Sequence, residues 1–411
     1  MADPGSDLVV PFYGEQYARG TLDDLIAPPY DVLSPADRKR FADRSEHNVV
    51  HLTLPENGDD RYAAAARLLS AWREGGVLRR ASRPGVTVVA QEFSGPDGRS
   101  MVRTGVIGAV AVEPFTARRV RPHERTHAGP KRDRLALLRA TRAMFEALLM
   151  MTRDADGRLR EALRTVTVRP CEVTATLNDV SVRSWWVTGS EARAISAAAG
   201  DLLYMADGHH RYETAVAFMD EVPAAARTLA LIVPLGDPGL VVRPTHRVIT
   251  GRLPDPDHLV EGLRERFHVR DLPLSADATA ALEAARGRGT HAALVLADRV
   301  TLLELKPGVE LKTDHSMPPA VAALDVARVD AWVVSPLETS SGPDAQRTYT
   351  ADAAEAARAV RAGSAAGAVL LNPPAVEDVL RVADADAVMP PKSTYFQPKV
   401  PSGLVMLDVT A

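Results

Sequence analysis

Cysteine is almost absent from this sequence of 411 residues, which contains a single one, Cys171. One cysteine excludes an intramolecular disulfide and any metal site built from several cysteines. Long apolar runs are also missing: no stretch of about 18 uncharged apolar residues occurs, so we predict no membrane-spanning helix. The start of the sequence, residues 1–12, has neither the basic segment nor the apolar core of a signal peptide. These absences predict a cytoplasmic protein.

An excess of positive charge is missing as well. The 49 Lys and Arg residues are balanced by 53 Asp and Glu residues, which gives a formal net charge of -4. A nucleic-acid-binding protein needs a basic face, and the sequence after Arg211 shows no helix-turn-helix pattern with such a face. We therefore expect no nucleic acid and no membrane among the partners.

Several familiar sequence motifs are absent. The chain has no G-x-G-x-x-G after a strand and no G-x-x-x-x-G-K-[ST], so it has neither a Rossmann nor a P-loop nucleotide site. It also lacks the G-x-S-x-G of a serine hydrolase and the H-E-x-x-H of a zinc protease. Any nucleotide site must be of another kind.

The apolar pattern predicts helices and strands that alternate along the whole chain, which indicates an α/β or α+β fold. We predict a long helix over 132–151, strands over 165–173 and 180–187, and a helix over 35–48 that is capped by Ser34 with Pro35 in its first turn. The length suits two or three domains. We place the boundaries near residues 115 and 250, which gives regions 1–115, 116–250 and 251–411.

The segment Asp207-Gly-His-His-Arg211 follows an apolar run and directly precedes a helical pattern. Gly208 permits a tight turn there, and the helix start would point backbone N–H groups and the positive end of its dipole at an anion. His209, His210 and Arg211 add donors that suit phosphate oxygens. Asp207 could hold Mg²⁺ together with phosphates, or it could simply cap the helix. So many such residues in one turn favour a phosphate site.

A second polar segment runs from Arg121 to Lys131 and contains Glu124. Its cationic neighbours would keep this carboxylate ionised, as a general base requires. A solvated loop with incidental ion pairs is the alternative. In this segment we predict that Arg125, Thr126 and Lys131 contact phosphate and that His123 contacts the substrate.

Two more segments are candidates. The loop 389–399 is fixed by prolines and could close over a site with Lys392, Ser393 and Thr394 on phosphate, or it could be a packed C-terminal tail. The segment Arg243-Pro-Thr-His-Arg247 offers His246 and Arg247 as substrate-binding residues.

These segments together resemble a known family. Ala27-Pro-Pro-Tyr-Asp-Val32, Arg121-Pro-His-Glu-Arg-Thr126, Ala206-Asp-Gly-His-His-Arg-Tyr-Glu213, Pro244-Thr-His-Arg247 and Met389-Pro-Pro-Lys-Ser-Thr-Tyr-Phe396 are similar to a prokaryotic family of unknown function that is sometimes labelled ParB-related. The Glu124 and Asp207–Arg211 segments also resemble, more distantly, those of free serine kinases of the ParB/sulfiredoxin superfamily. The resemblance implies a ParB/sulfiredoxin-like core over 116–250 with additional α/β regions on both sides.

The same resemblance implies an activity. Glu124 would be the base that acts on a hydroxyl, and Asp207, Gly208, His209, His210 and Arg211 would hold nucleotide phosphates and Mg²⁺. The expected reaction is phosphoryl transfer from ATP or ADP to a small metabolite such as serine, or its reverse. The alternatives are a CTP-binding switch of the ParB kind without DNA, and a metal-dependent hydrolase that uses His123, His127, His209 and His210. The partners would be the nucleotide, the small substrate and, in a homodimer, a second copy of the chain.

Overall fold

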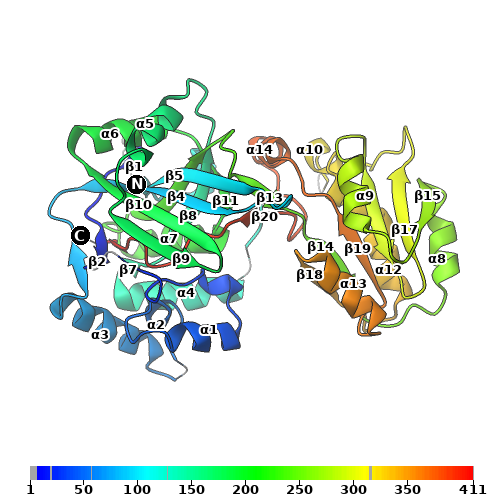
Figure 1. Cartoon of the computed structure of the whole chain (residues 1–411), viewed down its shortest axis with the longest axis horizontal. Helices are drawn as coiled ribbons and strands as arrows, with labels where there is room; N and C mark the ends of the chain where they lie inside the picture. Colours follow the sequence, from blue (N-terminus) through cyan, green and yellow to red (C-terminus); the bar gives the residue numbers. More distant parts are fainter. Residues whose placement is uncertain (1–6, 19–20, 57, 127, 314–316, 411) are drawn as a thin grey trace. The chain divides into compact units, whose positions relative to one another are not determined.

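The structure, a computed structural model, describes residues 7–18, 21–56, 58–126, 128–313 and 317–410. The chain divides into two compact units (Figure 1): Met1–Val241 together with Pro398–Ala411 form the first, and Val242–Gln397 form the second. Both units mix helices and strands, so the expected α/β class is confirmed. No helix in these described ranges is both long enough and apolar enough to cross a membrane.

A mixed nine-stranded sheet forms the centre of the first unit. Its order is β6-β11-β8-β12-β5-β4-β10-β9, with β1 pairing to β5. The pairs β11–β6 and β12–β8 are parallel, and the other pairs are antiparallel. The strands are β1 Val9–Val10, β4 Gly85–Ser94, β5 Ser100–Ala111, β6 Val120–Arg121, β8 Leu148–Thr152, β9 Val173–Leu177, β10 Val180–Thr188, β11 Leu203–Asp207 and β12 Arg227–Pro234.

Helices cover both sides of this sheet. Helices α5 and α6 pack against β4 on one side, and α7 packs against β8 and β12 (Figure 1). Helix α4 packs against α7, and α3 packs against α4. Buried Leu159 and Leu163 of α5 and Ile195 of α6 pack against the apolar side chains of the strands, which removes that face of the sheet from water. The helices are α1 Pro35–Ala42, α2 Val50–Thr53, α3 Arg61–Glu74, α4 Ala128–Thr141, α5 Arg158–Thr167, α6 Gly189–Ala198 and α7 His209–Glu221, with short 3₁₀ helices η1 Tyr30–Val32 and η2 Phe115–Ala117.

The start of α1 follows the sequence prediction. Ser34 Oγ accepts a hydrogen bond from the backbone N–H of Asp37 at 3.1 Å, and the Asp37 carboxylate accepts one from the backbone N–H of Ser34 at 3.2 Å. With Pro35 in the first turn, this is a complete capping box.

Three predicted elements have the wrong bounds, and the first of them, the helix expected over 35–48, ends at Ala42. The helix expected over 132–151 ends at Thr141, and residues 148–152 form the buried strand β8. The residue after α4, Arg142, has a φ of 54°, which helical backbone does not allow, and the Leu-Leu-Met-Met run that follows carries no periodicity to separate helix from strand. Of the strand expected over 165–173, residues 165–167 form the end of α5, residues 168–172 are turn and coil, and β9 begins only at Val173.

The predicted boundary near residue 115 falls inside the nine-stranded sheet, because β5 before it pairs with β12 after it. The predicted boundary near 250 lies close to the division at Val241. The C-terminal segment rejoins the first unit, where Ser402 bridges to Ala27, Met406 bridges to Glu15 and β21 (Leu407–Asp408) pairs with β7 (Ala143–Met144). A further small ribbon pairs β2 (Glu15–Tyr17) with β3 (Leu78–Arg80).

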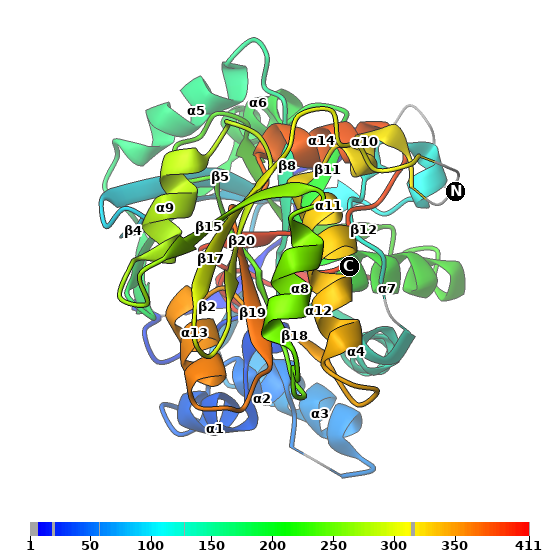
Figure 2. The ribbon, with the colours of Figure 1, turned by 90° about the vertical axis from the view of Figure 1, so that its right-hand side faces the viewer.

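The second unit contains an antiparallel six-stranded sheet of order β15-β17-β16-β19-β14-β18. Helices α9 and α13 cover one face, and α8 and α12 lie on the other (Figure 2). The strands of this sheet are β14 His246–Ile249, β15 Phe267–Leu272, β16 His291–Val295, β17 Val300–Leu305, β18 Arg347–Thr350 and β19 Gly367–Leu371. A separate two-stranded sheet pairs β13 Val241–Arg243 with β20 Tyr395–Gln397. The helices are α8 Pro256–Leu263, α9 Ala278–Ala285, α10 Pro319–Ala322, α11 Asp325–Val329, the π-helical η3 Asp330–Val334, α12 Ser335–Ser340, α13 Ala353–Arg361 and α14 Val376–Asp384.

Candidate functional site

The turn between β11 and α7 has the geometry that its sequence predicts. Asp207 is the last residue of β11, Gly208 is the N-cap, and α7 begins at His209. Gly208 has a φ of 93°, and a Cβ placed there would lie 2.6 Å from Leu148 Cδ2 and 3.1 Å from Arg211 Nη2. Only glycine satisfies both the left-handed backbone and this close approach. The turn therefore brings the start of α7 directly beside the end of a buried strand.

Asp207 is held between two cations. Arg211 Nη2 donates to Asp207 Oδ2 at 3.0 Å, and Lys399 Nζ donates to Asp207 Oδ1. The side chains of Asp207 and Lys399 are 18% and 16% exposed, so the pair is largely enclosed but still reaches solvent. Burial alone would raise the pKa of Asp207, but Lys399 and Arg211 outweigh it and lower that pKa to about 2. The carboxylate is therefore fully ionised at neutral pH.

A second aspartate, Asp31, lies near this pair and behaves in the opposite way. It follows Tyr30 in the Ala27–Val32 segment and remains open to solvent. Even so, protein atoms crowd around the carboxyl group itself, and this desolvation raises its pKa. The negative charge of Asp207 raises that pKa further. The two neighbouring carboxyls thus differ in their readiness to bind a proton.

Glu146 completes the charged cluster around Arg211. Burial alone would lower the pKa of Arg211, but the charges of Glu146 and Asp31 raise it. The Glu146 carboxylate accepts hydrogen bonds from the backbone N–H of Tyr30 at 2.9 Å and from Ser402 Oγ at 3.0 Å. It thereby ties the Tyr30 segment and the C-terminal segment to the loop that precedes β8. We refer to Asp31, Glu146, Asp207, Arg211 and Lys399 as the charged cluster.

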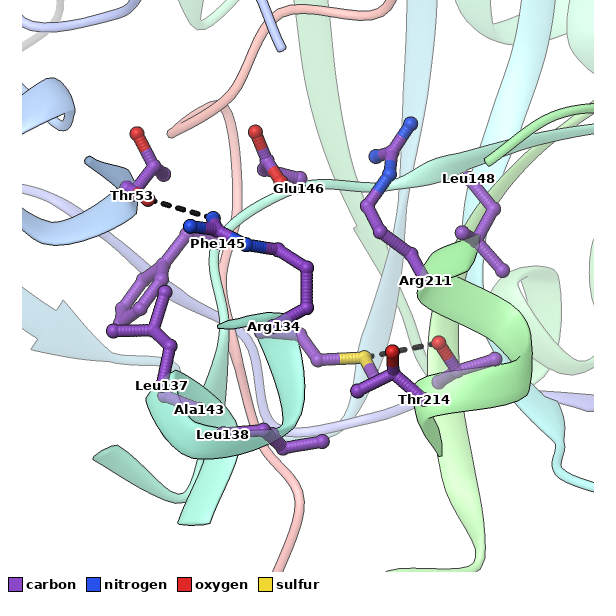
Figure 3. Close-up of a pocket in the computed structure, with 12 residues that line it drawn as sticks. Thr53, Arg134, Leu137, Leu138, Ala143, Phe145, Glu146, Leu148, Arg211 and Thr214 are labelled. Atoms are coloured by element: carbon purple, nitrogen blue, oxygen red, sulfur yellow. Dashed lines mark hydrogen bonds between the residues drawn. The ribbon is translucent and has the colours of Figure 1, made fainter. Parts of the chain in front are cut away.

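Arg134 of α4 borders the cluster on another side. Its guanidinium lies over the Tyr30 ring, 4.2 Å from the centroid, and Nη1 donates to the Thr53 carbonyl at 2.6 Å. Figure 3 shows Glu146 between Arg134, which comes from α4, and Arg211, which comes from α7. Both arginines line a cavity of about 50 Å³, a volume that suits water but not a metabolite.

His123 and His209 form a buried pair that joins the two predicted segments. Their rings meet edge to face, with centroids 4.7 Å apart. His123 Nδ1 lies 2.8 Å from the Met205 carbonyl, which can only accept, so this nitrogen carries the proton. Burial lowers the pKa of His123 to about 4 and that of His209 well below its ordinary value. Both rings are therefore neutral at pH 7, and neither adds the positive charge expected of a phosphate ligand.

Thr126 and Lys131 contact a protein carboxylate. Thr126 Oγ1 donates to Glu213 at 2.7 Å, and Lys131 Nζ forms an ion pair with the same oxygen. Because Glu213 belongs to α7, these contacts fasten the Arg121–Lys131 segment along the helix that begins at the Gly208 turn. The two segments therefore pack together along α7. Glu124 and His210 are half-buried and Arg125 is exposed.

The predicted residues from the two later segments all belong to the second unit. Arg247 is 1% exposed and donates through Nε to Asp330 at 2.8 Å. The backbone N–H of Leu371 donates to His246 Nδ1 at 3.2 Å, and Ser393 Oγ donates to the Pro390 carbonyl at 2.6 Å. Lys392 is exposed and Thr394 is half-buried. These contacts hold several of the side chains within their own unit, and their roles in ligand binding remain predictions.

The charged cluster contains residues that the sequence did not single out. Tyr30 and Asp31 lie within the Ala27–Val32 segment and Lys399 ends the loop 389–399, but no local pattern marks these three side chains as site residues. Glu146 gave no signal, because it fell inside the predicted long helix. Within the described ranges, no group of three His, Cys, Asp or Glu residues is placed to hold a metal ion, and His127 lies outside those ranges.

The family model described as "Protein of unknown function (DUF1015)" matches residues 9–327, which include the turn, the histidine pair and most of the cluster. The chain belongs to this family. No curated protein matches the sequence.

Solved structures that resemble this DUF1015 member are distant. A free serine kinase in complex with AMP is 15% identical, with 70% of this chain and 89% of that chain covered and a TM-score of 0.38. A conserved hypothetical protein from Pyrococcus furiosus is 14% identical, with coverages of 69% and 90% and a TM-score of 0.34. SbnI with a C-terminal truncation from Staphylococcus aureus is 11% identical, with coverages of 72% and 87% and a TM-score of 0.35.

Proposed function

We propose that this protein transfers a phosphoryl group between a nucleotide, ATP or ADP, and the hydroxyl of a small metabolite such as free serine. The observation that carries the proposal is the position of Asp207, which is kept ionised between Lys399 and Arg211 at the N-terminus of α7. Phosphoryl transfer needs little covalent chemistry from the protein, and positioning with charge neutralisation does most of the work. A helix start with two cations supplies both. Asp207, Arg211 and Glu146 belong to the ParB/sulfiredoxin-like core that we predict over residues 116–250, and Asp31 and Lys399 are contributed from outside it.

The residues of the cluster fit a divalent cation. Mg²⁺ usually takes one or two carboxylates beside the substrate phosphates, and Asp207, the carboxyl that stays ionised, is the residue that would hold it. When bound there, Mg²⁺ would neutralise phosphate charge. Arg211 and Lys399 would orient the phosphate oxygens, and the backbone N–H groups at the start of α7 would bind them.

Two carboxyls are candidates for the base that accepts the hydroxyl proton. Glu124 is the candidate from the sequence, and its segment is fastened to α7 through Glu213. Asp31 is the candidate from the site, because neighbouring carboxyls whose pKa values are pushed apart commonly divide the acid–base and electrostatic roles. Asp207 would then remain the permanent anion, and Asp31 would exchange the proton.

Matched variants separate these candidates. Replacing the base by its amide, through Glu124→Gln or Asp31→Asn, should lower turnover by about 10²–10⁴-fold. The variant at the other position should retain most of the activity. Turnover and melting temperature are measured on the same preparations with ATP or ADP, Mg²⁺ and serine. If both variants keep wild-type turnover per folded molecule, neither residue is the base.

A further inference from the structure

A second, larger cavity lies in the first unit, between α1, α3, α4 and the residues that follow α2. It has a volume of about 580 Å³, which falls within the range of small-molecule sites. Its walls are formed mainly by Arg38 of α1, Pro55, Arg61 and Tyr62 of α3, and Asp133 and Arg134 of α4. None of Asp31, Glu146, Asp207, Arg211 and Lys399 lines it, so it is distinct from the charged cluster.

One carboxylate organises the polar wall of this cavity. Asp133 Oδ1 accepts from Tyr62 Oη at 2.7 Å and from Arg61 Nη2 at 3.1 Å. The other oxygen of Asp133 accepts from Arg134 Nε at 2.8 Å. Burial alone would raise the pKa of Asp133, but Arg134 and Tyr62 lower it, so this group is a fixed anion with both oxygens occupied. It holds Arg61 and Arg134 in place, and its negative charge is already used in these two ion pairs.

Positive charge therefore exceeds negative charge along the wall. Three arginines, Arg38, Arg61 and Arg134, face the cavity against the carboxylates of Asp133 and Glu56. Glu56 pairs with Arg38 at 3.3 Å, but its side chain is 81% exposed, so solvent weakens this pair. Within the described part of the chain, Arg38 Nη2 is covered and has no acceptor, which leaves a buried donor to be satisfied.

We propose that this cavity binds a small molecule through an oxyanion, a phosphate or a carboxylate, which Arg61 and Arg38 contact from two different helices. Guanidinium groups held apart on rigid elements suit such oxygens, because they present fixed donors as well as charge. The Tyr62 ring, with the Arg61 guanidinium 4.7 Å from its centroid, gives the same wall an apolar surface for the rest of the ligand.

Arg134 connects this cavity to the charged cluster. It lines the large cavity, bonds Asp133 there, and stacks on Tyr30, whose backbone N–H donates to Glu146. A ligand that draws Arg61 or Asp133 toward itself would act on Arg134 and thereby on the Tyr30–Asp31 segment. Through this connection, binding of the oxyanion would influence the charged cluster. The binding itself can be measured without any catalytic turnover.

Calorimetric titrations of the full chain at constant ionic strength test the proposal. The probes are inorganic phosphate, glycerol 3-phosphate and malonate, so that the phosphate and carboxylate sources are compared directly. Arg61→Gln should weaken binding of the preferred probe by about 10–150-fold, the equivalent of one charge-assisted hydrogen bond. Arg67→Gln is the matched control, because Arg67 lies on the same helix, pairs with Asp60 and does not line the cavity.

Two further variants make the outcome decisive. Arg38→Gln removes a donor from the opposite wall and should also weaken binding, which covers the case in which Arg61→Gln does not fold. Lys399→Met removes a cation from the charged cluster, so the binding that remains in this variant, and that Arg61→Gln and Arg38→Gln weaken, belongs to the cavity. The proposal is overturned if no probe binds the wild-type chain. It is equally overturned if Arg67→Gln weakens binding as much as Arg61→Gln, or if Lys399→Met abolishes binding while Arg61→Gln and Arg38→Gln do not. None of these outcomes depends on whether the protein is a phosphotransferase.

Discussion

Lys399 and Asp207 form an ion pair although 192 residues separate them in the sequence. The contact forms because the C-terminal segment returns to the first unit after the whole second unit has been completed. A neighbouring contact fixes the same segment, since Gln91 Nε2 donates to the Lys399 carbonyl at 3.0 Å. The charged cluster therefore depends on the last residues of the chain as much as on the β11–α7 turn.

Removing the positive charge of Lys399 should destabilise the fold and change the charge of the site. We predict that Lys399→Met lowers the free energy of unfolding by about 2–4 kcal/mol, because it leaves Asp207 largely enclosed with one cation fewer. Chemical denaturation at neutral pH measures this loss. The control is Lys39→Met, whose exposed pair with Asp43 should contribute less than about 1 kcal/mol. Equal effects of the two substitutions would contradict the enclosed pair.

The glycine at the turn should tolerate no side chain. We predict that Gly208→Ala costs about 2–5 kcal/mol, because it adds a left-handed alanine and a clash with Leu148 Cδ2. Gly157 is the matched control: it is also a helix N-cap, with a φ of 71°, and has open space around its Cβ position. Gly157→Ala should cost only the backbone term, about 1 kcal/mol. If both variants lose the same stability, the close approach at Gly208 does not matter.

Stability should depend on pH through the buried histidines. The pKa of His123 is lowered to about 4, whereas in the unfolded chain it is about 6.5, so between these values only the unfolded chain binds the proton. Stability then falls as the pH decreases through this window, by up to about 1.4 kcal/mol per pH unit for this residue. His123→Asn keeps a donor for the Met205 carbonyl and removes the titration.

The comparison between wild type and variant isolates this effect. Burial raises the pKa of Asp237 to about 6, and that group contributes with the opposite sign over part of the same range. Urea unfolding at about pH 7 and about pH 5 should therefore show a smaller loss of stability on acidification for His123→Asn than for wild type. An identical loss in both would show that His123 is protonated in the folded state.

The local geometry of the site was predictable, and its composition only in part. A strand followed by glycine and a helix could be predicted at Asp207–His209, because local backbone preferences decide it. The roles of Thr126 and Lys131 were harder, since their partner Glu213 lies on another element and occupies donors that otherwise suit phosphate. Glu146 has no local signal, because the short apolar run after it is equally compatible with a helix and with the buried strand that it forms.

The long-range members of the cluster could not be derived from local patterns. Lys399 reaches Asp207 only because the chain returns to the first unit at Pro398, and no periodicity or turn signal predicts that return. The neutrality of His123 and His209 follows from burial that arises when the two segments pack together. Sequence identified the segments, and packing determined which of their side chains carry charge.

Phosphorus NMR of the full chain with ATP or ADP, Mg²⁺ and a panel of hydroxyl-bearing amino acids tests the central claim most directly. The account predicts a new phosphomonoester signal with one acceptor, or consumption of the phosphomonoester in the reverse direction. It also predicts loss of that signal in Lys399→Met, measured at a temperature at which the variant is folded. Nucleotide binding with no new phosphorus signal for any acceptor would contradict phosphoryl transfer and favour a nucleotide-binding switch.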